Sequence, residues 1–401
     1  VGYGKLTREG SQEVDGNTVF EIGSISKVFT TLLLADMVER GELSLDDPIA
    51  KFLPKSVKVP SKDGKEITLL HLATHTSALP RLPGNLSPKD VNNPYADYTV
   101  ENMYEFLSSY SLTRDIGSQY EYSNLGVGLL GHILTLKAGT DYETMVVSRT
   151  CIPLEMGSTS IKLSLEHQAS LATGHNQAGM PVMNWDIPTL AGAGALRSTV
   201  NDMLRFVAAN LGLMKSDLSA AMNRTHLVQK NTGQPDLEIA LGWHVPNKYG
   251  TEIVWHNGGT GGYHSFIGFD KKKRIGVVVL SNSANDIDDI GLHLIENKYE
   301  LAKFEPPKEH KAIKLDSRIY DAYVGQYELA PNFIIAITKE GDGLFAQATG
   351  QSKFEVFPES ETEFFYTVVD AQITFVRDEK GQVTHLVLHQ NGRDIPGKKI
   401  K

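Results

Sequence analysis

A serine and a lysine three positions apart stand at the start of an apolar, helix-like stretch. Ser24 and Lys27 lie in the segment Gly-Ser-Ile-Ser-Lys, the one place where the sequence reads Ser-x-x-Lys. Residues at i and i+3 share a helix face, so the amine could take the serine proton once burial or a neighbouring cation lowers its pKa. A helix N-terminus also favours negative charge on the serine oxygen. The alternative is a helix cap followed by a surface lysine, which this motif alone does not exclude.

A Tyr-x-Asn triplet, Tyr122-Ser123-Asn124, is the second candidate. A tyrosine hydroxyl can relay a proton if cations hold down its pKa, and an asparagine amide can bind a substrate carbonyl. In isolation the triplet is more typical of a turn with a core tyrosine.

A histidine followed by glycines, His256-Asn-Gly-Gly-Thr-Gly-Gly262, ends a predicted strand. Glycines at this place would let a substrate approach the backbone closely, and the histidine could hydrogen-bond it. By itself the segment also fits a glycine-rich hairpin turn with an exposed histidine.

Other motifs are weaker signals of function. Residues 126–131 fit Gly-x-Gly-x-x-Gly but follow no strand of a βαβ unit, so we interpret these glycines as helix-packing positions. His71 and His75 have the spacing of metal ligands without the accompanying glutamate, and a structural hydrogen-bonding role suits His75 better. The absence of Gly-x-Ser-x-Gly argues against an α/β-hydrolase.

Cys151 is the sole cysteine, which excludes an intramolecular disulfide, and we expect it to be buried. We expect neither a metal nor a cofactor.

Apolar periodicity predicts the elements that must position these residues. Helices are predicted at residues 28–40, 67–74, 126–136 and 285–304. Residues 192–212 contain a further helix, opened by Ser198-Thr199 with Asp202 close behind, which is a capping pattern. Strands are predicted at residues 252–256, 263–270 and 275–281, with the basic run at 271–274 as a hairpin turn. Residues 79–98 form a loop rich in proline and asparagine, of a length that is often functional.

The composition changes towards the end of the chain. Residues 305–316 include a polar, proline-bearing stretch typical of a linker. The pattern from residue 317 onward is all strand, with a hairpin signal at 373–388. We therefore predict a first domain at 1–304 and a β-domain at 317–401.

Charge and hydropathy exclude several classes of partner. The net charge of −9 argues against a nucleic-acid partner, since phosphate binding needs a concentrated basic surface. No apolar run of about 18 residues is present, so no segment is predicted to span a membrane. The chain begins at Val1 and is silent on an export signal.

The three candidate motifs, in this order and approximate spacing, resemble the class C β-lactamase and DD-peptidase family of penicillin-recognising serine enzymes. Thr18–Lys27, Leu72–Pro80 and Gly192–Thr199 look like the same family, so the resemblance covers roughly residues 1–300. It implies an α/β (α+β) fold of the β-lactamase/transpeptidase type, with an antiparallel sheet flanked by helices and a helical subdomain. The C-terminal part resembles the small lipocalin-like β-barrel appended to some members.

The resemblance also implies catalytic roles. Ser24 would be the acylated nucleophile, and Lys27 and Tyr122 would share the general-base and general-acid work. The oxyanion hole would consist of the backbone N–H groups of Ser24 and Gly259.

Substrate binding would fall to Asn124, His256 and Gly258. His256 stands where many β-lactamases of this family have lysine. A histidine with an unperturbed pKa of ~6.5 is mostly neutral at pH 7, so its attraction for a substrate carboxylate is weaker and efficient β-lactam turnover is in question.

These roles predict a serine hydrolase that cleaves a β-lactam or a D-Ala-type peptide through an acyl-enzyme. The alternatives are a carboxylesterase on the same machinery and a penicillin-binding sensor that is acylated without turnover. The expected partners are a small-molecule or peptide substrate and, in a homo-oligomer, further copies of the chain. The resemblance further implies an exported protein (periplasmic, extracellular or cell-envelope), and a helix and a first strand upstream of Gly2.

Overall fold

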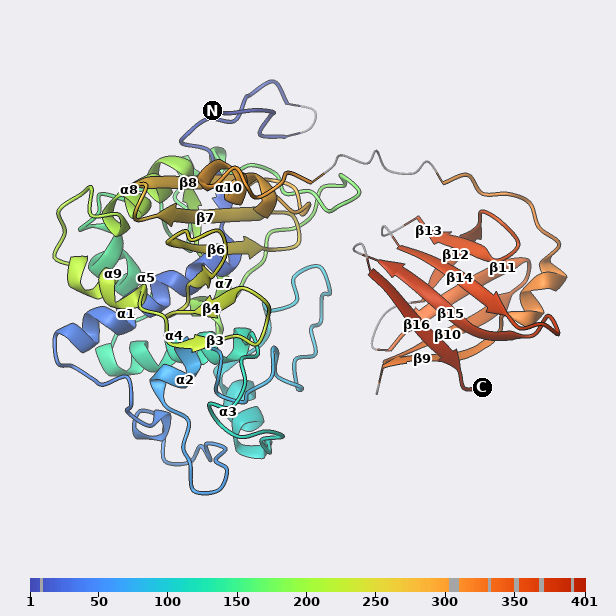
Figure 1. The fold of residues 1–401 in the computed structure, drawn as a ribbon, viewed down its shortest axis with the longest axis horizontal. Helices are drawn as coiled ribbons and strands as arrows, with labels where there is room; N and C mark the ends of the chain where they lie inside the picture. Colours follow the sequence, from blue (N-terminus) through green and yellow to red (C-terminus); the bar gives the residue numbers. More distant parts are fainter. Residues whose placement is uncertain (8–9, 303–309, 331–332, 350–352, 368–370, 391–392) are drawn as a thin grey trace. The chain divides into compact units, whose positions relative to one another are not determined.

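The chain folds into two compact units, Val1–Ala302 and Lys303–Lys401, which are described separately (Figure 1). The computed structural model describes residues 1–7, 10–302, 310–330, 333–349, 353–367, 371–390 and 393–401. The start of the predicted linker, residues 305–309, lies outside the described residues.

A six-stranded antiparallel sheet organises the first unit, with strand order β3-β4-β5-β6-β7-β8. The strands are β3 (Lys230–Asn231), β4 (Leu237–Ile239), β5 (His244–Pro246), β6 (Ile253–Gly259), β7 (His264–Asp270) and β8 (Ile275–Ser281). Side chains of a strand alternate between its faces. Val254 and Ile267 accordingly join the main core, whereas Ile253 and Phe266 join a smaller cluster on the opposite face.

Helices cover both faces of this sheet. α8 (Val200–Asn210) packs on the main-core face, where its Val207 fills the space above Gly276. α10 (Asp288–Ile295) packs on the opposite face, with Gly291 against the ring of Phe266. The β7–β8 connection at residues 271–274 is the predicted hairpin turn.

Of the remaining helices, α2 (Leu69–Ala73) and α3 (Val100–Ser109) lie below the β3–β4 edge of the sheet in the view of Figure 1. α1 (Ser26–Glu39) is buried along almost its whole length, as expected of a helix that is apolar on all sides. The others are α4 (Asn124–Ala138), α5 (Tyr142–Val146), α6 (Leu165–Ala169), α7 (Ala191–Gly194) and α9 (Ser219–Thr225). A two-stranded ribbon of β1 (Val19–Glu21) and β2 (Arg197–Thr199) precedes the serine turn and α8.

One predicted helix with a capping pattern is confirmed, and another is wrong in extent. Residues 192–212 contain the predicted helix, α8, which Thr199 caps by accepting from the backbone N–H of Asp202; α7 and strand β2 lie ahead of it. The helix predicted at 285–304 is the shorter α10, because Glu296 adopts an extended conformation. The Glu296 carboxylate accepts from Lys273 Nζ and from the backbone N–H of Lys298, and these polar contacts replace helical ones.

The weaker motifs of the sequence, the glycines at 126–131 and His71, have structural roles. Gly128 and Gly131 of α4 lie against Leu190 and Gly192, which confirms their interpretation as helix-packing positions. His71 caps α2 through Thr68, and Cys151 is buried. Among the described residues, no helix is both long and apolar enough to cross a bilayer.

The second unit contains the predicted C-terminal β-barrel, a closed barrel in which every neighbouring pair of strands is antiparallel. Its strands are β9 (Gly325–Ala330), β10 (Phe333–Glu340), β11 (Gly343–Ala348), β12 (Phe354–Pro358), β13 (Glu363–Tyr366), β14 (Ala371–Arg377), β15 (Val383–Gln390) and β16 (Arg393–Lys399). Tyr327, Phe364 and Phe375 belong to the core packed inside it. Eight antiparallel strands are also the number in lipocalin-type barrels.

Candidate active site

The serine and the lysine of Ser-x-x-Lys lie one helical turn apart. Ser24 belongs to the 3-10 turn Gly23–Ile25, and Lys27 lies in the first turn of α1. Lys27 Nζ donates hydrogen bonds to Ser24 Oγ at 2.9 Å and to the carbonyl oxygen of Ala193 at 2.6 Å. The amine is thus within direct proton-transfer distance of the serine hydroxyl.

The Lys27 side chain is completely buried. Burial, and after it the charge of Arg81, lower the pKa of Lys27 well below its ordinary value of 10.5. The physical cause is that a low-dielectric surrounding disfavours the ammonium form. An uncharged amine has the lone pair that can accept the Ser24 proton.

Tyr122 brings a third proton-carrying group to the serine. Its hydroxyl hydrogen-bonds to Ser24, and Lys27 Nζ lies 4.8 Å from its ring centroid. Contrary to the expectation that cations hold down the pKa of this phenol, burial outweighs the influence of Arg81 and raises that pKa. Tyr122 therefore keeps its proton at neutral pH and can pass that proton on, whereas Lys27 is suited to be the initial base.

Buried contacts fix the turn that carries Tyr122 and Asn124. The backbone N–H of Ser123 donates to His75 Nδ1 at 3.0 Å, which confirms a structural hydrogen-bonding role for that histidine. The Ser123 hydroxyl caps α4 by accepting from the backbone N–H of Gly126 at 2.8 Å. Asn124 Oδ1 is buried and has no hydrogen-bond partner within the described part of the chain. This oxygen is available to accept a substrate N–H.

The end of β6 lies against the serine turn with no room for side chains. A Cβ on Gly258 would stand 2.1 Å from the carbonyl oxygen of Ile22 and 2.9 Å from the backbone nitrogen of Ser24. A Cβ on Gly23, which has φ of +47°, would stand 2.9 Å from the backbone nitrogen of Gly259. The N–H groups of Ser24 and Gly259 are therefore near each other, as the two donors of an oxyanion hole must be.

His256 is covered by its neighbours. It is fully buried, and its Nδ1 contacts the carbonyl oxygen of Asn257. Its ring stacks on that of His244 with the centroids 5.0 Å apart. Burial, followed by the neighbouring His244 and Lys27, lowers the pKa of His256 well below 6.5. The imidazole is therefore neutral at pH 7, and more completely so than an unperturbed histidine.

A cavity of about 500 Å³ includes Ser24 in its lining, a volume typical of small-molecule sites. Its lining consists of Ser24, Arg81, Leu82, Tyr95, Tyr120, Tyr122, Asn124, Trp185, Gln234, Leu237, His244, Trp255, Asn257, Gly258 and Gly259. The described ladder between β5 and β6 consists of the single pair His244–Trp255. The β6 edge at residues 257–259 extends beyond it, so an extended substrate could pair with this edge.

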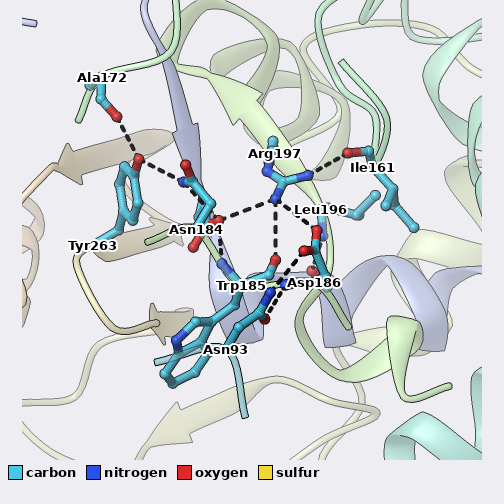
Figure 2. A network of polar contacts seen from close by, with 11 residues as sticks. Asn93, Ile161, Ala172, Asn184, Trp185, Asp186, Leu196, Arg197 and Tyr263 are labelled. Atoms are coloured by element: carbon cyan, nitrogen blue, oxygen red, sulfur yellow. Dashed lines mark hydrogen bonds and ion pairs between the residues drawn. The ribbon is translucent and has the colours of Figure 1, made fainter. Parts of the chain in front are cut away.

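A buried polar network holds Trp185 in the cavity wall (Figure 2). The Glu21 carboxylate accepts from the backbone N–H of Trp185 at 3.0 Å and from Asn184 Nδ2 at 2.9 Å. Arg197, which comes from a stretch that resembles the family, pairs with the same carboxylate at 3.3 Å. These contacts hold the Trp185 segment on the β1–β2 ribbon.

A second pair of hydrogen bonds joins this segment to the long loop at residues 79–98 (Figure 2). Asn93 Nδ2 donates to Asp186 Oδ2 at 2.9 Å, and the backbone N–H of Asp186 donates to Asn93 Oδ1 at 2.8 Å. The rings of Tyr95 and Trp185 meet edge to face at 5.5 Å beside them. The loop is thereby part of the cavity wall.

Sequence reasoning did not single out Arg81, Tyr95 or Trp185 as site residues. The available signal was the length of the 79–98 loop, which contains the first two and which we expected to be functional. Trp185 lies in an irregular segment whose pattern has no period to reveal it.

Comparisons with known proteins agree with this arrangement. The family described as Beta-lactamase matches residues 1–296, and Domain of unknown function (DUF3471) matches residues 309–399. The chain is 26% identical to penicillin-binding protein 4* of Bacillus subtilis (strain 168), over 98% of this chain and 90% of that protein. It is 29% identical to the D-alanyl-D-alanine-carboxypeptidase/endopeptidase AmpH of Escherichia coli (strain K12), over 74% of this chain and 81% of that protein.

A solved structure shares the fold. The β-lactamase/D-alanine carboxypeptidase from Yersinia pestis, complexed with citrate, is 26% identical and superposes with a TM-score of 0.62. The match covers 70% of this chain and 82% of that one.

Proposed function

The chain belongs to the beta-lactamase family and is a serine hydrolase, and we propose that it cleaves β-lactams or D-Ala-containing peptides through an acyl-enzyme on Ser24. The observation that carries this assignment is the 2.9 Å hydrogen bond from the buried Lys27 amine to Ser24 Oγ. The relatives named above, a penicillin-binding protein and a D-alanyl-D-alanine-carboxypeptidase, support the substrate class.

Acylation begins with attack of Ser24 Oγ on the substrate carbonyl carbon while Lys27 Nζ accepts the hydroxyl proton. Negative charge then develops on the carbonyl oxygen, which receives hydrogen bonds from the backbone N–H groups of Ser24 and Gly259. This stabilisation is stronger in the transition state than in the bound substrate, so it lowers the barrier.

The tetrahedral intermediate collapses when the carbon–nitrogen bond breaks and the leaving nitrogen receives a proton. Tyr122 delivers this proton, because its raised pKa keeps the hydroxyl protonated, and it recovers one from Lys27. Water then attacks the acyl-serine ester, and the same groups return the proton to Ser24 Oγ. Asn124 orients the substrate amide during both steps.

Gly258 lines the cavity, whereas the predicted substrate-binding residue His256 is fully buried and does not. The absence of a side chain at Gly258 lets the end of β6 pack directly on the serine turn. His256 is a neutral neighbour of Lys27 and contributes no charge that would compete with proton transfer.

The proposed substrate also indicates where the enzyme acts. A D-Ala peptide belongs to the cell envelope, so export of the enzyme is part of the same proposal. The net charge of −9 is consistent with a small-molecule or peptide substrate. It argues against a nucleic-acid partner.

The test is turnover of three substrates by the wild type and by Ser24→Ala. They are a chromogenic cephalosporin, an acyl-D-Ala-D-Ala peptide and a short-chain p-nitrophenyl ester. The wild type should hydrolyse the cephalosporin or the peptide, and Ser24→Ala should lose on the order of 10⁴–10⁶ in kcat. Turnover of the ester alone would replace the proposal by a carboxylesterase, and a stable adduct without turnover would replace it by a sensor.

A further inference from the structure

Arg81 is anchored beside the catalytic tyrosine by its own backbone. Its carbonyl oxygen accepts from the backbone N–H of Asn124 at 2.9 Å and from that of Leu125 at 3.2 Å. Its guanidinium carbon lies 5.1 Å from the centroid of the Tyr122 ring. The charge is thus held next to the group that meets the leaving side of the substrate, although the Arg81 residue as a whole is exposed.

This guanidinium has no acidic partner within the described part of the chain. The described ion pairs of arginine to carboxylate are made by Arg40, Arg114, Arg149, Arg197, Arg205, Arg224 and Arg318. Exposed arginines on a protein surface are common, and exposure alone would indicate nothing. The position of Arg81 in the lining of the Ser24 cavity is what distinguishes it.

The electrostatic character of that cavity follows from its lining. Arg81 is the one lining residue with a permanent charge, and the lining includes no aspartate or glutamate. The histidine of the lining, His244, has its pKa lowered to about 4 by burial and is neutral at pH 7. A cavity with one cation and no anion favours an anionic substrate.

We propose that Arg81 binds the substrate carboxylate on the leaving-group side of the scissile bond, in place of a cation at His256. This inference rests on the proposed function. A guanidinium can hold a carboxylate through two parallel N–H···O hydrogen bonds. The aliphatic part of its side chain can lie along the Tyr122 ring at the same time. The substrate class is therefore a peptide or β-lactam with a free carboxylate within about one residue of the bond that is cleaved.

The experiment compares Arg81→Gln and Arg81→Lys with the wild type on a matched pair of peptides. One peptide is acyl-D-Ala-D-Ala with a free carboxylate, and the other is the same peptide as its C-terminal amide. The readout is the ratio of kcat/KM for the acid to kcat/KM for the amide, because any effect on Lys27 or Tyr122 cancels in it. Lys89→Gln removes a cation from the same loop but outside the cavity lining and serves as the matched control.

The wild type should prefer the acid, and Arg81→Gln should reduce that preference roughly tenfold to a hundredfold, as expected for a lost charge-assisted hydrogen bond. Arg81→Lys should retain part of the preference, and Lys89→Gln should retain all of it. Equal losses on acid and amide would overturn the proposal and assign Arg81 an effect on the catalytic groups instead. Unchanged kcat/KM values on both peptides would also overturn it.

Failure of the underlying function is a separate outcome. If the wild type hydrolyses neither peptide nor a cephalosporin, the proposed function fails and the role of Arg81 falls with it. If the wild type hydrolyses both peptides equally and Ser24→Ala hydrolyses neither, the function stands and the Arg81 proposal alone is overturned.

Discussion

The ring of His75 stacks on the ring of Tyr122, with 4.5 Å between the centroids and 29° between the planes. Burial lowers the pKa of His75 well below 6.5, so this platform is uncharged at neutral pH. The stack positions the phenol without placing a cation beneath it. The permanent charge near Tyr122 is therefore that of Arg81.

Tyr122→Phe keeps this stack and removes only the hydroxyl. We expect kcat to fall by roughly 10²–10⁴ because proton transfer to the leaving group is lost, with little change in the melting temperature. Tyr104→Phe, which removes a hydroxyl that contacts His132 away from the cavity lining, is the control and should retain full activity. A Tyr122→Phe enzyme within threefold of the wild-type kcat would show that another group protonates the leaving nitrogen.

The pH profile of the reaction should report the buried amine. Lys27 is a base only when deprotonated, so kcat/KM on an uncharged ester should rise with pH through the lowered pKa of Lys27 and level off far below pH 10.5. Arg81→Gln should move this rise to higher pH, because the Arg81 charge contributes to lowering that pKa. A rise centred near pH 10.5 would contradict the burial argument.

Gly258→Ala should disable the oxyanion hole. The new Cβ would stand 2.1 Å from the Ile22 carbonyl oxygen, so the serine turn or the end of β6 must move. Loss of one oxyanion donor costs about 10²–10³ in kcat, and we expect at least that. Gly157→Ala adds the same methyl group in open space and is the control. Unchanged turnover by Gly258→Ala would mean that this backbone does not take part in the reaction.

The buried neutral histidines should make the first unit sensitive to acid. Burial lowers the pKa of His226 to about 3 and that of His244 to about 4. An unfolded histidine titrates near 6.5, so between these values the unfolded state binds more protons than the folded state. The stabilisation is complete above pH 6.5 and is lost as the pH falls towards the folded-state pKa values, by up to ~1.4 kcal/mol per pH unit for each histidine.

Urea unfolding of the full chain between pH 7 and pH 5 measures this loss. His226→Gln can still hydrogen-bond with Asn210 but does not titrate. It should therefore weaken the pH dependence by about one proton, without affecting catalysis. An identical pH dependence in this variant would place the acid sensitivity elsewhere.

How much could be read from the sequence differs between the parts of the site. The placing of Ser24 and Lys27 on one face depends only on helical spacing, and the predicted helix begins within two residues of α1. The raised pKa of Tyr122 was not predictable, because it depends on burial by segments distant in sequence. Likewise the C-terminal end of α10 depends on the contact of Glu296 with Lys273, which no local pattern encodes.

Arg81 is a site residue that the sequence could not identify. Its loop was predicted to be functional from length alone, but loop residues have no periodicity that would say which of them face a cavity. Only the tertiary contact of its backbone with the start of α4 places it beside Tyr122.

The most direct test of the account is mass spectrometry of the intact protein during incubation with a penicillin, followed by peptide mapping. The account predicts a transient mass increase equal to one penicillin, located on the peptide that contains Ser24 and absent in Ser24→Ala. An adduct on any other residue, or full penicillin turnover by Ser24→Ala, would contradict it.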